Sequence, residues 1–268
     1  MTASHINLIK KRKNMPLQFS DKCVLITGSS KGIGRAAAMM FAEQGARVAV
    51  HYNRDRNSAE KTLKDLTGSD HIIVREDLAE TDAPQHLVEK TIKEFGRIDV
   101  LVNNAGIYEE HPIADTDYDE WQDVWQRTLA INLEGPANIL FCAVKHMVKS
   151  GGGKIINISS RGAFRGEPDA PAYGASKAGL NAMSQSMAKA LAPHNIFVYA
   201  VAPGFVETEM TAFLLDAPEG DEIRNQSPLG RVAKPEEVAK TVVFLASEGS
   251  DFLTGGIIDV NGASYLRS

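Results

Sequence analysis

Apolar runs alternate with helical patterns along the whole chain, and this alternation constrains the fold more than any other feature. Seven runs are apolar almost throughout, at residues 23–28, 47–52, 71–77, 98–106, 154–159, 196–203 and 257–262. Helical patterns lie between them, at residues 34–46, 57–67, 83–95, 119–149, 173–192 and 235–247. Strands without polar alternation are buried on both faces, which is typical of a parallel sheet covered by helices. The pattern predicts an α/β fold, a single doubly wound Rossmann-type domain with a seven-stranded parallel sheet.

Composition excludes several other classes of protein. The 268 residues are 43% hydrophobic and 24% charged, which suits one globular domain with a full core. The net charge of −5 argues against nucleic-acid binding, and no apolar window approaches the ~20 residues of a membrane span. Two cysteines, Cys23 and Cys142, favour a reducing compartment over a disulfide scaffold. We therefore expect a cytoplasmic protein that binds neither nucleic acid nor membranes.

The first residues of the chain differ from the rest. Four basic side chains, Lys10 to Lys13, lie in a stretch of twenty residues that contains no acidic one. We divide the chain into an N-terminal extension, residues 1–16, and a domain over residues 17–268. The extension is expected to be disordered.

Glycines follow the first predicted strand at intervals that suit a phosphate-binding turn. Gly28 can leave the strand with a positive φ, and Gly32 has no Cβ to obstruct a pyrophosphate. Gly34 lets the next helix pack close to the sheet, with its N-terminal N–H groups toward the phosphates. The G-x3-G-x-G spacing differs from the common dinucleotide fingerprint, so by itself it also fits a purely structural turn.

The end of the second predicted strand bears on the choice of cofactor. An acidic residue there would accept from a ribose 2′-hydroxyl and repel a 2′-phosphate. Tyr52 occupies that place and is followed by Asn53 and Arg54. Lys31 and Arg54 can both reach a 2′-phosphate through charge-assisted hydrogen bonds. These residues predict NADP(H), with NAD(H) as the alternative, unless the two cations are ordinary solvated charges.

Further polar motifs lie where later strands end. They are Asn103-Asn104-Ala105-Gly106, Ser159-Ser160, and the pair Tyr173 and Lys177 on a predicted helix. Ligands of an open parallel sheet bind beyond the carboxyl ends of its strands, and residues four apart share one helix face. Each motif alone is more typical of a turn or a surface pair, whereas the ordered set indicates an active site. No metal site is expected, because the adjacent Glu109, Glu110 and His111 would rarely converge on one ion.

The motifs TGSSKGIG, NNAG, INLEG, ISS, YGASK and APGFVET, in this order and spacing, resemble the short-chain dehydrogenase/reductase family over roughly residues 17–268. The resemblance implies that Asn132, Ser160, Tyr173 and Lys177 are catalytic. It also implies that Asp77 binds the adenine and that Val206 and Thr208 hold the nicotinamide carboxamide. The complete expected cofactor site comprises Gly28, Ser30, Lys31, Gly32, Ile33, Gly34, Asn53, Arg54, Asp77, Leu78, Asn104, Ala105, Gly106, Tyr173, Lys177, Pro203, Gly204, Val206 and Thr208.

These residue types suit ketone reduction, in which a hydride goes to carbon and a proton to oxygen. The nicotinamide carries the hydride, so the protein must position the substrate, polarise its carbonyl group and protonate the carbonyl oxygen. A phenol with a pKa of ~10 is a poor acid–base catalyst at neutral pH, and a nearby ammonium such as Lys177 would lower that pKa. Ser160 would donate to the carbonyl oxygen, and Asn132 would hold a water that links Lys177 to solvent.

The chain looks most like the branch of the family that contains 3-oxoacyl-(acyl-carrier-protein) reductases. We therefore expect an oxidoreductase that converts a ketone to a secondary alcohol, or the reverse. A sugar, polyol or other alcohol dehydrogenase is the alternative, and a non-catalytic dinucleotide sensor is a third hypothesis.

Departures from that branch bear on the partners. Gly151 and His194 stand where those reductases carry arginines for the acidic carrier protein, which puts a carrier-protein partner in doubt. Arg161 and Arg165 would suit a small anionic or polyol substrate. The substrate is expected between residues 161–172 and an insertion at 207–228 that can close as a lid. The resemblance also implies a homotetramer.

Overall fold

The computed structural model describes residues 19–218 and 220–267. The proposed N-terminal extension, residues 1–16, lies outside the described residues.

A seven-stranded parallel sheet forms the centre of the molecule, as the sequence predicts. Its strands are β1 (Cys23–Ile26), β2 (Arg47–Tyr52), β3 (Ile72–Arg75), β4 (Val100–Asn103), β5 (Gly153–Ile158), β6 (Ile196–Pro203) and β7 (Ile257–Val260). Their order across the sheet is β3-β2-β1-β4-β5-β6-β7, and every pair is parallel. The order reverses direction between β1 and β4, where a doubly wound sheet opens a crevice for a ligand.

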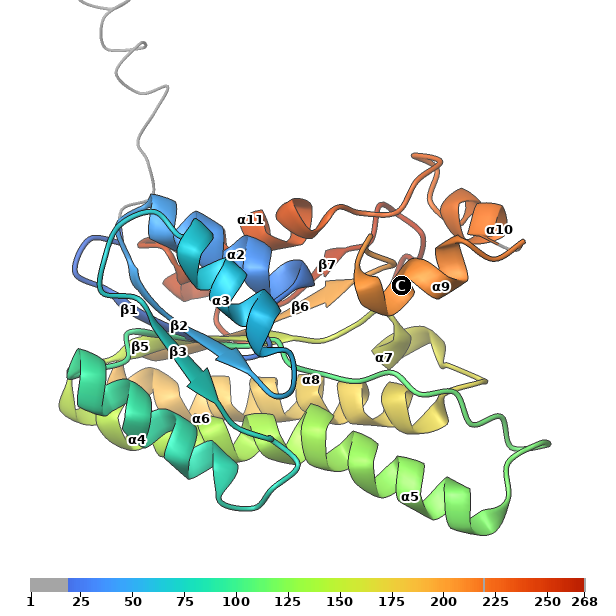
Figure 1. Cartoon of the computed structure of the whole chain (residues 1–268), viewed down its shortest axis with the longest axis horizontal. Helices are drawn as coiled ribbons and strands as arrows, with labels where there is room; N and C mark the ends of the chain where they lie inside the picture. The colour runs from blue at the N-terminus through green and yellow to red at the C-terminus, as the bar shows by residue number, and fades with distance from the viewer. Residues whose placement is uncertain (1–18, 219, 268) are drawn as a thin grey trace, which may run out of the picture.

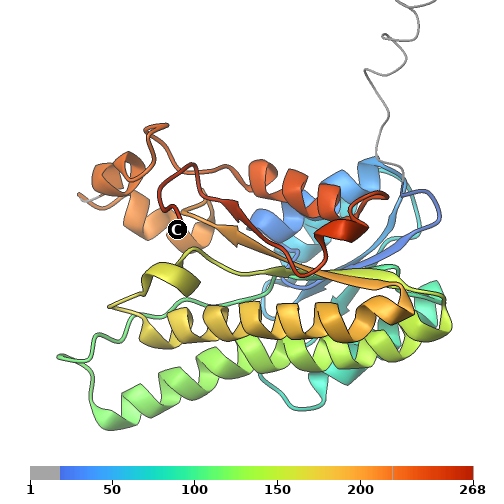
Figure 2. The same ribbon diagram turned by 180° about the vertical axis from the view of Figure 1, so that it is seen from behind.

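Helices cover both faces of the sheet (Figures 1 and 2). One layer contains α2 (Gly32–Glu43), α3 (Arg56–Asp65) and α11 (Pro235–Ala246), and the other α4 (Ala83–Phe95), α5 (Tyr118–Leu129), α6 (Gly135–Lys149) and α8 (Pro171–Leu191). The short helices α7 (Gly162–Arg165), α9 (Glu209–Leu215) and α10 (Gly220–Asn225) lie at the carboxyl edge of the sheet. None of the helices among the described residues is long and apolar enough to cross a membrane.

The two layers explain why the strands are apolar throughout. Along β1, Val24 and Ile26 belong to the core cluster under α2 and α11. Cys23 and Leu25, which alternate with them, belong to the cluster under α4 and α6. Successive side chains of a strand point to opposite faces, so both faces must be apolar when both are covered.

The predicted helix over residues 119–149 is not continuous in the structure. A π-helical turn, Ala130–Glu134, separates α5 from α6, and the Gly135 N–H donates to the Ala130 carbonyl. Such turns occur mostly inside α-helices and often at functional sites. Asn132 lies within this turn and is fully buried.

Candidate active site

A cavity of about 370 Å³ lies at the carboxyl ends of β1, β4, β5 and β6. The predicted site residues that line it are Gly28, Lys31, Gly32, Ile33, Asn104, Ala105, Gly106, Ser160, Tyr173, Lys177, Pro203, Gly204, Val206 and Thr208. Those that do not line it are Ser30, Gly34, Asn53, Arg54, Asp77, Leu78 and Asn132. The cavity extends from the glycine turn to Tyr173, and the residues expected at the adenosine end of a cofactor lie outside its lining.

The glycine turn between β1 and α2 depends on missing side chains. Gly28 has a φ of +62°, and Gly32 a φ of +55°. A Cβ at Gly34 would lie 2.5 Å from the Gly28 carbonyl oxygen, a backbone atom that cannot swing aside. The turn therefore brings the backbone of β1 and the first turn of α2 closer together than any other residue would allow.

Asn104 holds this turn against the end of β4. Its Nδ2 donates to the carbonyl oxygens of Thr27 at 2.9 Å and Gly28 at 3.0 Å. The Thr27 hydroxyl in turn accepts from the Asn104 and Ala105 backbone N–H groups at 2.9 and 3.0 Å. The polar side chains at the ends of these two neighbouring strands therefore fix the floor of the cavity.

Sequence reasoning missed His51, which supports the same turn from β2. Its Nδ1 accepts from the Gly28 N–H at 3.0 Å, and its Nε2 lies 3.1 Å from the Glu76 carbonyl oxygen, to which it must donate. The ring is 2% exposed, and burial lowers the pKa of His51 to about 4. The feature of the sequence that could have indicated this role is a histidine in an otherwise apolar strand, next to the strand end where the cofactor is predicted to bind.

We expect His51 to make the fold sensitive to mild acid. Its folded pKa of about 4 lies below the unfolded value of 6.5, so only the unfolded chain takes up a proton between these values. The stabilisation is present above pH 6.5 and is lost as the pH falls toward 4. Urea unfolding should show a loss of about 2 kcal/mol between pH 7 and pH 5.

The control for this prediction is His51→Asn, in which an amide oxygen can still accept from Gly28. Carboxylates that titrate in the same range contribute equally to both proteins. An equal loss of unfolding free energy in the variant would contradict the role given to His51.

Ser160, Tyr173 and Lys177 meet at the end of β5. Burial raises the pKa of Tyr173, and a hydrogen bond with the Ser160 hydroxyl partly opposes that rise. Lys177 Nζ donates to the Ile158 carbonyl oxygen at 2.9 Å and lies 5.8 Å from the centre of the Tyr173 ring. Burial lowers the pKa of Lys177 to about 8. The expected lowering of the Tyr173 pKa is therefore not the dominant effect in this arrangement, where desolvation favours the neutral phenol.

Asn132 approaches Lys177 from the π-helical turn. Its amide is paired with the Ile107 backbone, accepting from the N–H at 2.8 Å and donating to the carbonyl at 2.9 Å. A Cβ at Gly106 would lie 3.2 Å from Asn132 Oδ1 and 3.3 Å from Lys177 Nζ. Gly106 thus leaves the space that lets these two polar groups approach each other.

Lys31 is not a free cation in the structure. Its Nζ lies 2.7 Å from Asp55 Oδ2 and 2.6 Å from Glu209 Oε2 of α9. The hydrogen bond from Lys31, together with those from the Ser58 N–H and hydroxyl groups, holds the pKa of Asp55 well below its usual range. Arg54 is exposed, and Asn53 contributes a backbone carbonyl that accepts from Arg75. Asp55 is thus an acidic neighbour of the predicted 2′-phosphate site that sequence reasoning did not weigh.

The remaining predicted residues lie on the margins of the cavity. Asp77 Oδ1 accepts from the Ala79 N–H at 3.1 Å, and Leu78 is 6% exposed in the core. Ser30 uses its backbone carbonyl to accept from Thr62. The Gly32 Cβ position lies 3.2 Å from the Thr208 methyl group, so the turn and the start of the lid touch.

Glu109 and His111, which we do not expect to bind a metal, have other partners in the structure. Glu109 pairs with Arg127, its Oε1 accepting at 3.0 Å, and the Glu109 backbone carbonyl lies 2.9 Å from His111 Nδ1. Among residues 19–218 and 220–267, no group of three or more His, Cys, Asp or Glu side chains could hold a metal ion.

A smaller cavity of about 90 Å³ adjoins Ser160 and Tyr173 on the lid side. Its walls include Tyr108, Phe205, Met210, Leu214 and the carboxylate-bearing Glu167. The Tyr108 and Tyr173 rings meet edge to face, with centres 5.2 Å apart. The small cavity lies next to the side chains of Ser160 and Tyr173, so a substrate carbonyl group bound there would be close to both hydroxyl groups.

Arg161 and Arg165, which we expect to bind an anionic substrate, both have other partners in the structure. Arg165 pairs with Glu167 at 3.3 Å. Arg161 is 3% exposed, and its guanidinium donates to Ser264 Oγ at 2.6 Å, on the far side of this wall. Glu167 and Arg161 both line the small cavity, but Glu167 is paired with Arg165 and the Arg161 guanidinium donates to Ser264.

A doubly wound sheet with a cavity over its glycine turn, and a Ser, Tyr and Lys cluster in that cavity, is the arrangement of an oxidoreductase that acts on CH–OH and C=O groups. The chain belongs to the short-chain dehydrogenase/reductase family. A family model described as enoyl-(acyl carrier protein) reductase matches residues 28–263.

Individual relatives cover nearly the whole chain. The chain is 37% identical to the 3-oxoacyl-(acyl-carrier-protein) reductase of Staphylococcus aureus over 247 residues, 91% of this chain and 98% of that protein. It is 38% identical to the reductase of the same name from Thermotoga maritima over 252 residues, 93% and 100% of the two chains. A crystal structure of a glucose/ribitol dehydrogenase of the family from Brucella melitensis matches with a TM-score of 0.86 and 33% identity, over 94% and 100% of the two chains.

Proposed function

We propose that the protein is an NADP(H)-dependent reductase that converts a small ketone to a secondary alcohol, with Asn132, Ser160, Tyr173 and Lys177 as its catalytic residues. The observation that carries this proposal is that Ser160 and Tyr173 line both the cavity over the glycine turn and the small cavity beside it, while Lys177 lines the first of these. A bound nicotinamide dinucleotide would supply the hydride.

The residues have separate tasks in this proposal. Tyr173 gives its phenolic proton to the substrate oxygen, and Ser160 donates a hydrogen bond to the same oxygen. Lys177, with a pKa of about 8, stays mostly protonated at neutral pH and stabilises the phenolate that Tyr173 leaves behind. Asn132 holds the loop after β4 through Ile107, and its place near Lys177 suits a water that would restore the proton.

Small free ketones fit the site better than carrier-bound chains. The cavity beside Tyr173 measures about 90 Å³ and is mostly apolar. Gly151 and His194 offer no arginine to an acidic carrier protein, which supports a partner-free reaction.

Substrate profiling tests this proposal. We expect NADPH oxidation with small neutral 3-oxo esters, and turnover of acetoacetyl thioesters that does not improve when the thioester is attached to carrier protein. The alternative, a sugar or polyol dehydrogenase, is favoured by the structural likeness to a glucose/ribitol dehydrogenase. Oxidation of polyols without any ketone reduction would establish that alternative instead.

The preference for NADP(H) rests on Lys31, Arg54 and the lack of an acid at Tyr52. Asp55 opposes it, because its carboxylate holds the Lys31 ammonium. We expect Asp55→Ser to tighten NADPH binding about fivefold, because it removes one of the two carboxylates that hold Lys31, with little change for NADH. The matched variant Arg54→Ala should weaken NADPH and leave NADH unchanged. Fluorescence titration of both cofactors measures these effects, and tighter binding of NADH than NADPH to the unaltered protein would refute the preference.

Exposed apolar side chains support a homotetramer and suggest which surfaces would form its interfaces. Phe141 on α6 is 61% exposed and Phe252 is fully exposed, which is unusual for side chains of this size. Sedimentation equilibrium would test this assembly, and a monomer at micromolar concentration would exclude it. The free thiols of Cys23 and Cys142 fit the proposed cytoplasmic location.

A further inference from the structure

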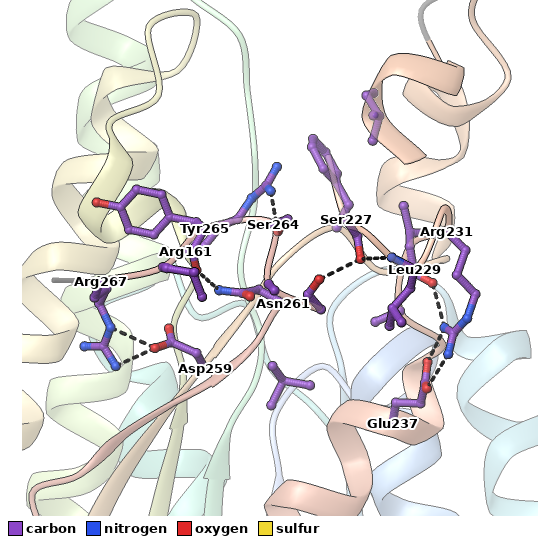
Figure 3. Close-up of a pocket in the computed structure, with 18 residues that line it drawn as sticks. Arg161, Ser227, Leu229, Arg231, Glu237, Asp259, Asn261, Ser264, Tyr265 and Arg267 are labelled. Carbon is purple, nitrogen blue, oxygen red and sulfur yellow. Dashed lines mark hydrogen bonds and ion pairs between the residues drawn. The ribbon is translucent and has the colours of Figure 1, made fainter. Parts of the chain in front are cut away.

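A second large cavity, of about 430 Å³, is drawn in Figure 3. It shares no lining residue with the cavity over the glycine turn, and it shares Arg161 and Phe205 with the small cavity. It is formed by residues 259–267, by residues 223–233 at the end of the 207–228 insertion and directly after it, and by the start of α11. Apolar side chains supply much of its lining, with Phe205, Ile223, Leu229, Val260 and Leu266. Its size falls within the range of cavities that hold small organic ligands.

Three arginines line this second cavity, and two of them are neutralised. Arg231 donates to both carboxylate oxygens of Glu237, at 2.7 and 2.8 Å. Arg267 donates to Asp259 at 2.8 Å. Both ion pairs appear in Figure 3 as dashed contacts at opposite sides of the cavity.

Arg161 is the third arginine, and its contacts are all with neutral groups. Its guanidinium donates to Ser264 Oγ at 2.6 Å and to Gln226 Oε1, and it lies 4.9 Å from the centre of the Phe205 ring. Within the described part of the chain, no carboxylate lies within ion-pair distance of it. Only 3% of Arg161 is exposed. A buried charge without a counter-charge is unfavourable unless something neutralises it.

No acidic side chain near Arg161 compensates its positive charge among the described residues. Glu167, the acid that acts on Arg161 most directly, is already paired with Arg165. The side chains around Arg161 therefore leave one positive charge uncompensated at the wall of an open, partly apolar cavity. A guanidinium in this setting presents planar donors that match a carboxylate or phosphate.

We propose that the second cavity binds a small organic anion with an apolar body, and that Arg161 is its counter-ion. Arg161 directly follows Ser160, its backbone N–H donates to the Pro203 carbonyl at 2.9 Å, and it also lines the substrate cavity. An anion bound at Arg161 would therefore change the electrostatic environment of the substrate carbonyl group. The anion is either a separate ligand or the distal acidic group of a long substrate, and the two share this chemistry.

Binding of benzoate to the NADP⁺-saturated protein tests the proposal. Saturation keeps the probe out of the pyrophosphate region, and calorimetry needs no turnover, so the result is independent of the proposed reaction. Benzoate is expected to bind about tenfold or more tightly than benzyl alcohol, its uncharged analogue. Equal affinities, or no saturable binding of benzoate, would overturn the proposal.

Variants of the lining arginines make the test specific. Arg161→Met should weaken benzoate about tenfold, whereas Arg161→Lys, which keeps the charge, should retain part of the affinity. Arg231→Met is the matched control, because Arg231 lines the same cavity but is already neutralised by Glu237. A loss in Arg231→Met as large as in Arg161→Met would contradict the assignment.

Kinetics with benzoate distinguish the two sources of the anion. Competitive inhibition against the ketone would identify the anion as part of the substrate, and noncompetitive inhibition would identify a separate ligand. Unaltered kinetics at benzoate concentrations that saturate the calorimetric site would overturn the link between Arg161 and the reaction.

Discussion

Tyr173→Phe is expected to lower kcat for ketone reduction by about 10²- to 10⁴-fold. The change removes the phenolic proton and the hydrogen bond with Ser160 but keeps the ring that packs against Tyr108. Steady-state NADPH oxidation with a saturating ketone measures the effect. Tyr173 is only partly buried and its ring is retained, so the fold should be little altered by the loss of one oxygen atom.

The cofactor affinity of the same variant is its control. NADPH should bind Tyr173→Phe within about threefold of the unaltered protein, since the glycine turn is unchanged. A variant that turned over at more than a tenth of the normal rate would refute the proposed acid and would revive a different catalytic group. Turnover that is absent in both proteins would favour a dinucleotide sensor.

Gly34→Ala is expected to weaken NADPH binding by about 100-fold or more and to destabilise the fold. The added methyl would lie 2.5 Å from the Gly28 carbonyl oxygen and 2.9 Å from Ser29 Cα, so the backbone of the turn must move. The start of α2 would then shift away from the phosphate position, and the overpacked contact would cost about 1–3 kcal/mol. Titration with NADPH and urea unfolding measure the two effects.

Gly174→Ala is the matched control, because it adds the same methyl to a helix at the same site. Its Cβ would meet its nearest neighbours at 3.6 Å or more, which is ordinary contact. We expect normal NADPH affinity there. An unaltered affinity in Gly34→Ala would show that the turn does not carry the phosphates.

The parts of the fold that could be predicted from the sequence are those set by local pattern. The strands are continuous apolar runs, and α4 begins and ends where the sequence predicts, at Ala83 and Phe95, because Gly96 supplies a left-handed residue after it. Seven strands in one parallel sheet followed from the alternation alone.

The parts that could not be predicted depend on residues far apart in sequence. Lys31 and Glu209 are 178 residues apart, and their ion pair changes what Lys31 is free to do. From the sequence alone, His51 looks like an ordinary strand residue, because its contacts with Gly28 and Glu76 appear only in the structure. Arg161 reads as a substrate-facing cation, because nothing in the local pattern shows that it turns toward Ser264.

The π-helical turn at Ala130–Glu134 sets the phase between two helices. A turn of this kind holds one residue more than an α-helical turn, so the residues before and after it are offset by about 100° around the axis. With that offset, the Asn132 amide pairs with the Ile107 backbone. The number of residues from Tyr118 to Lys149 is therefore constrained by the geometry of the site as well as by the core. A relative with one residue fewer in this stretch would need a different anchor for the loop after β4.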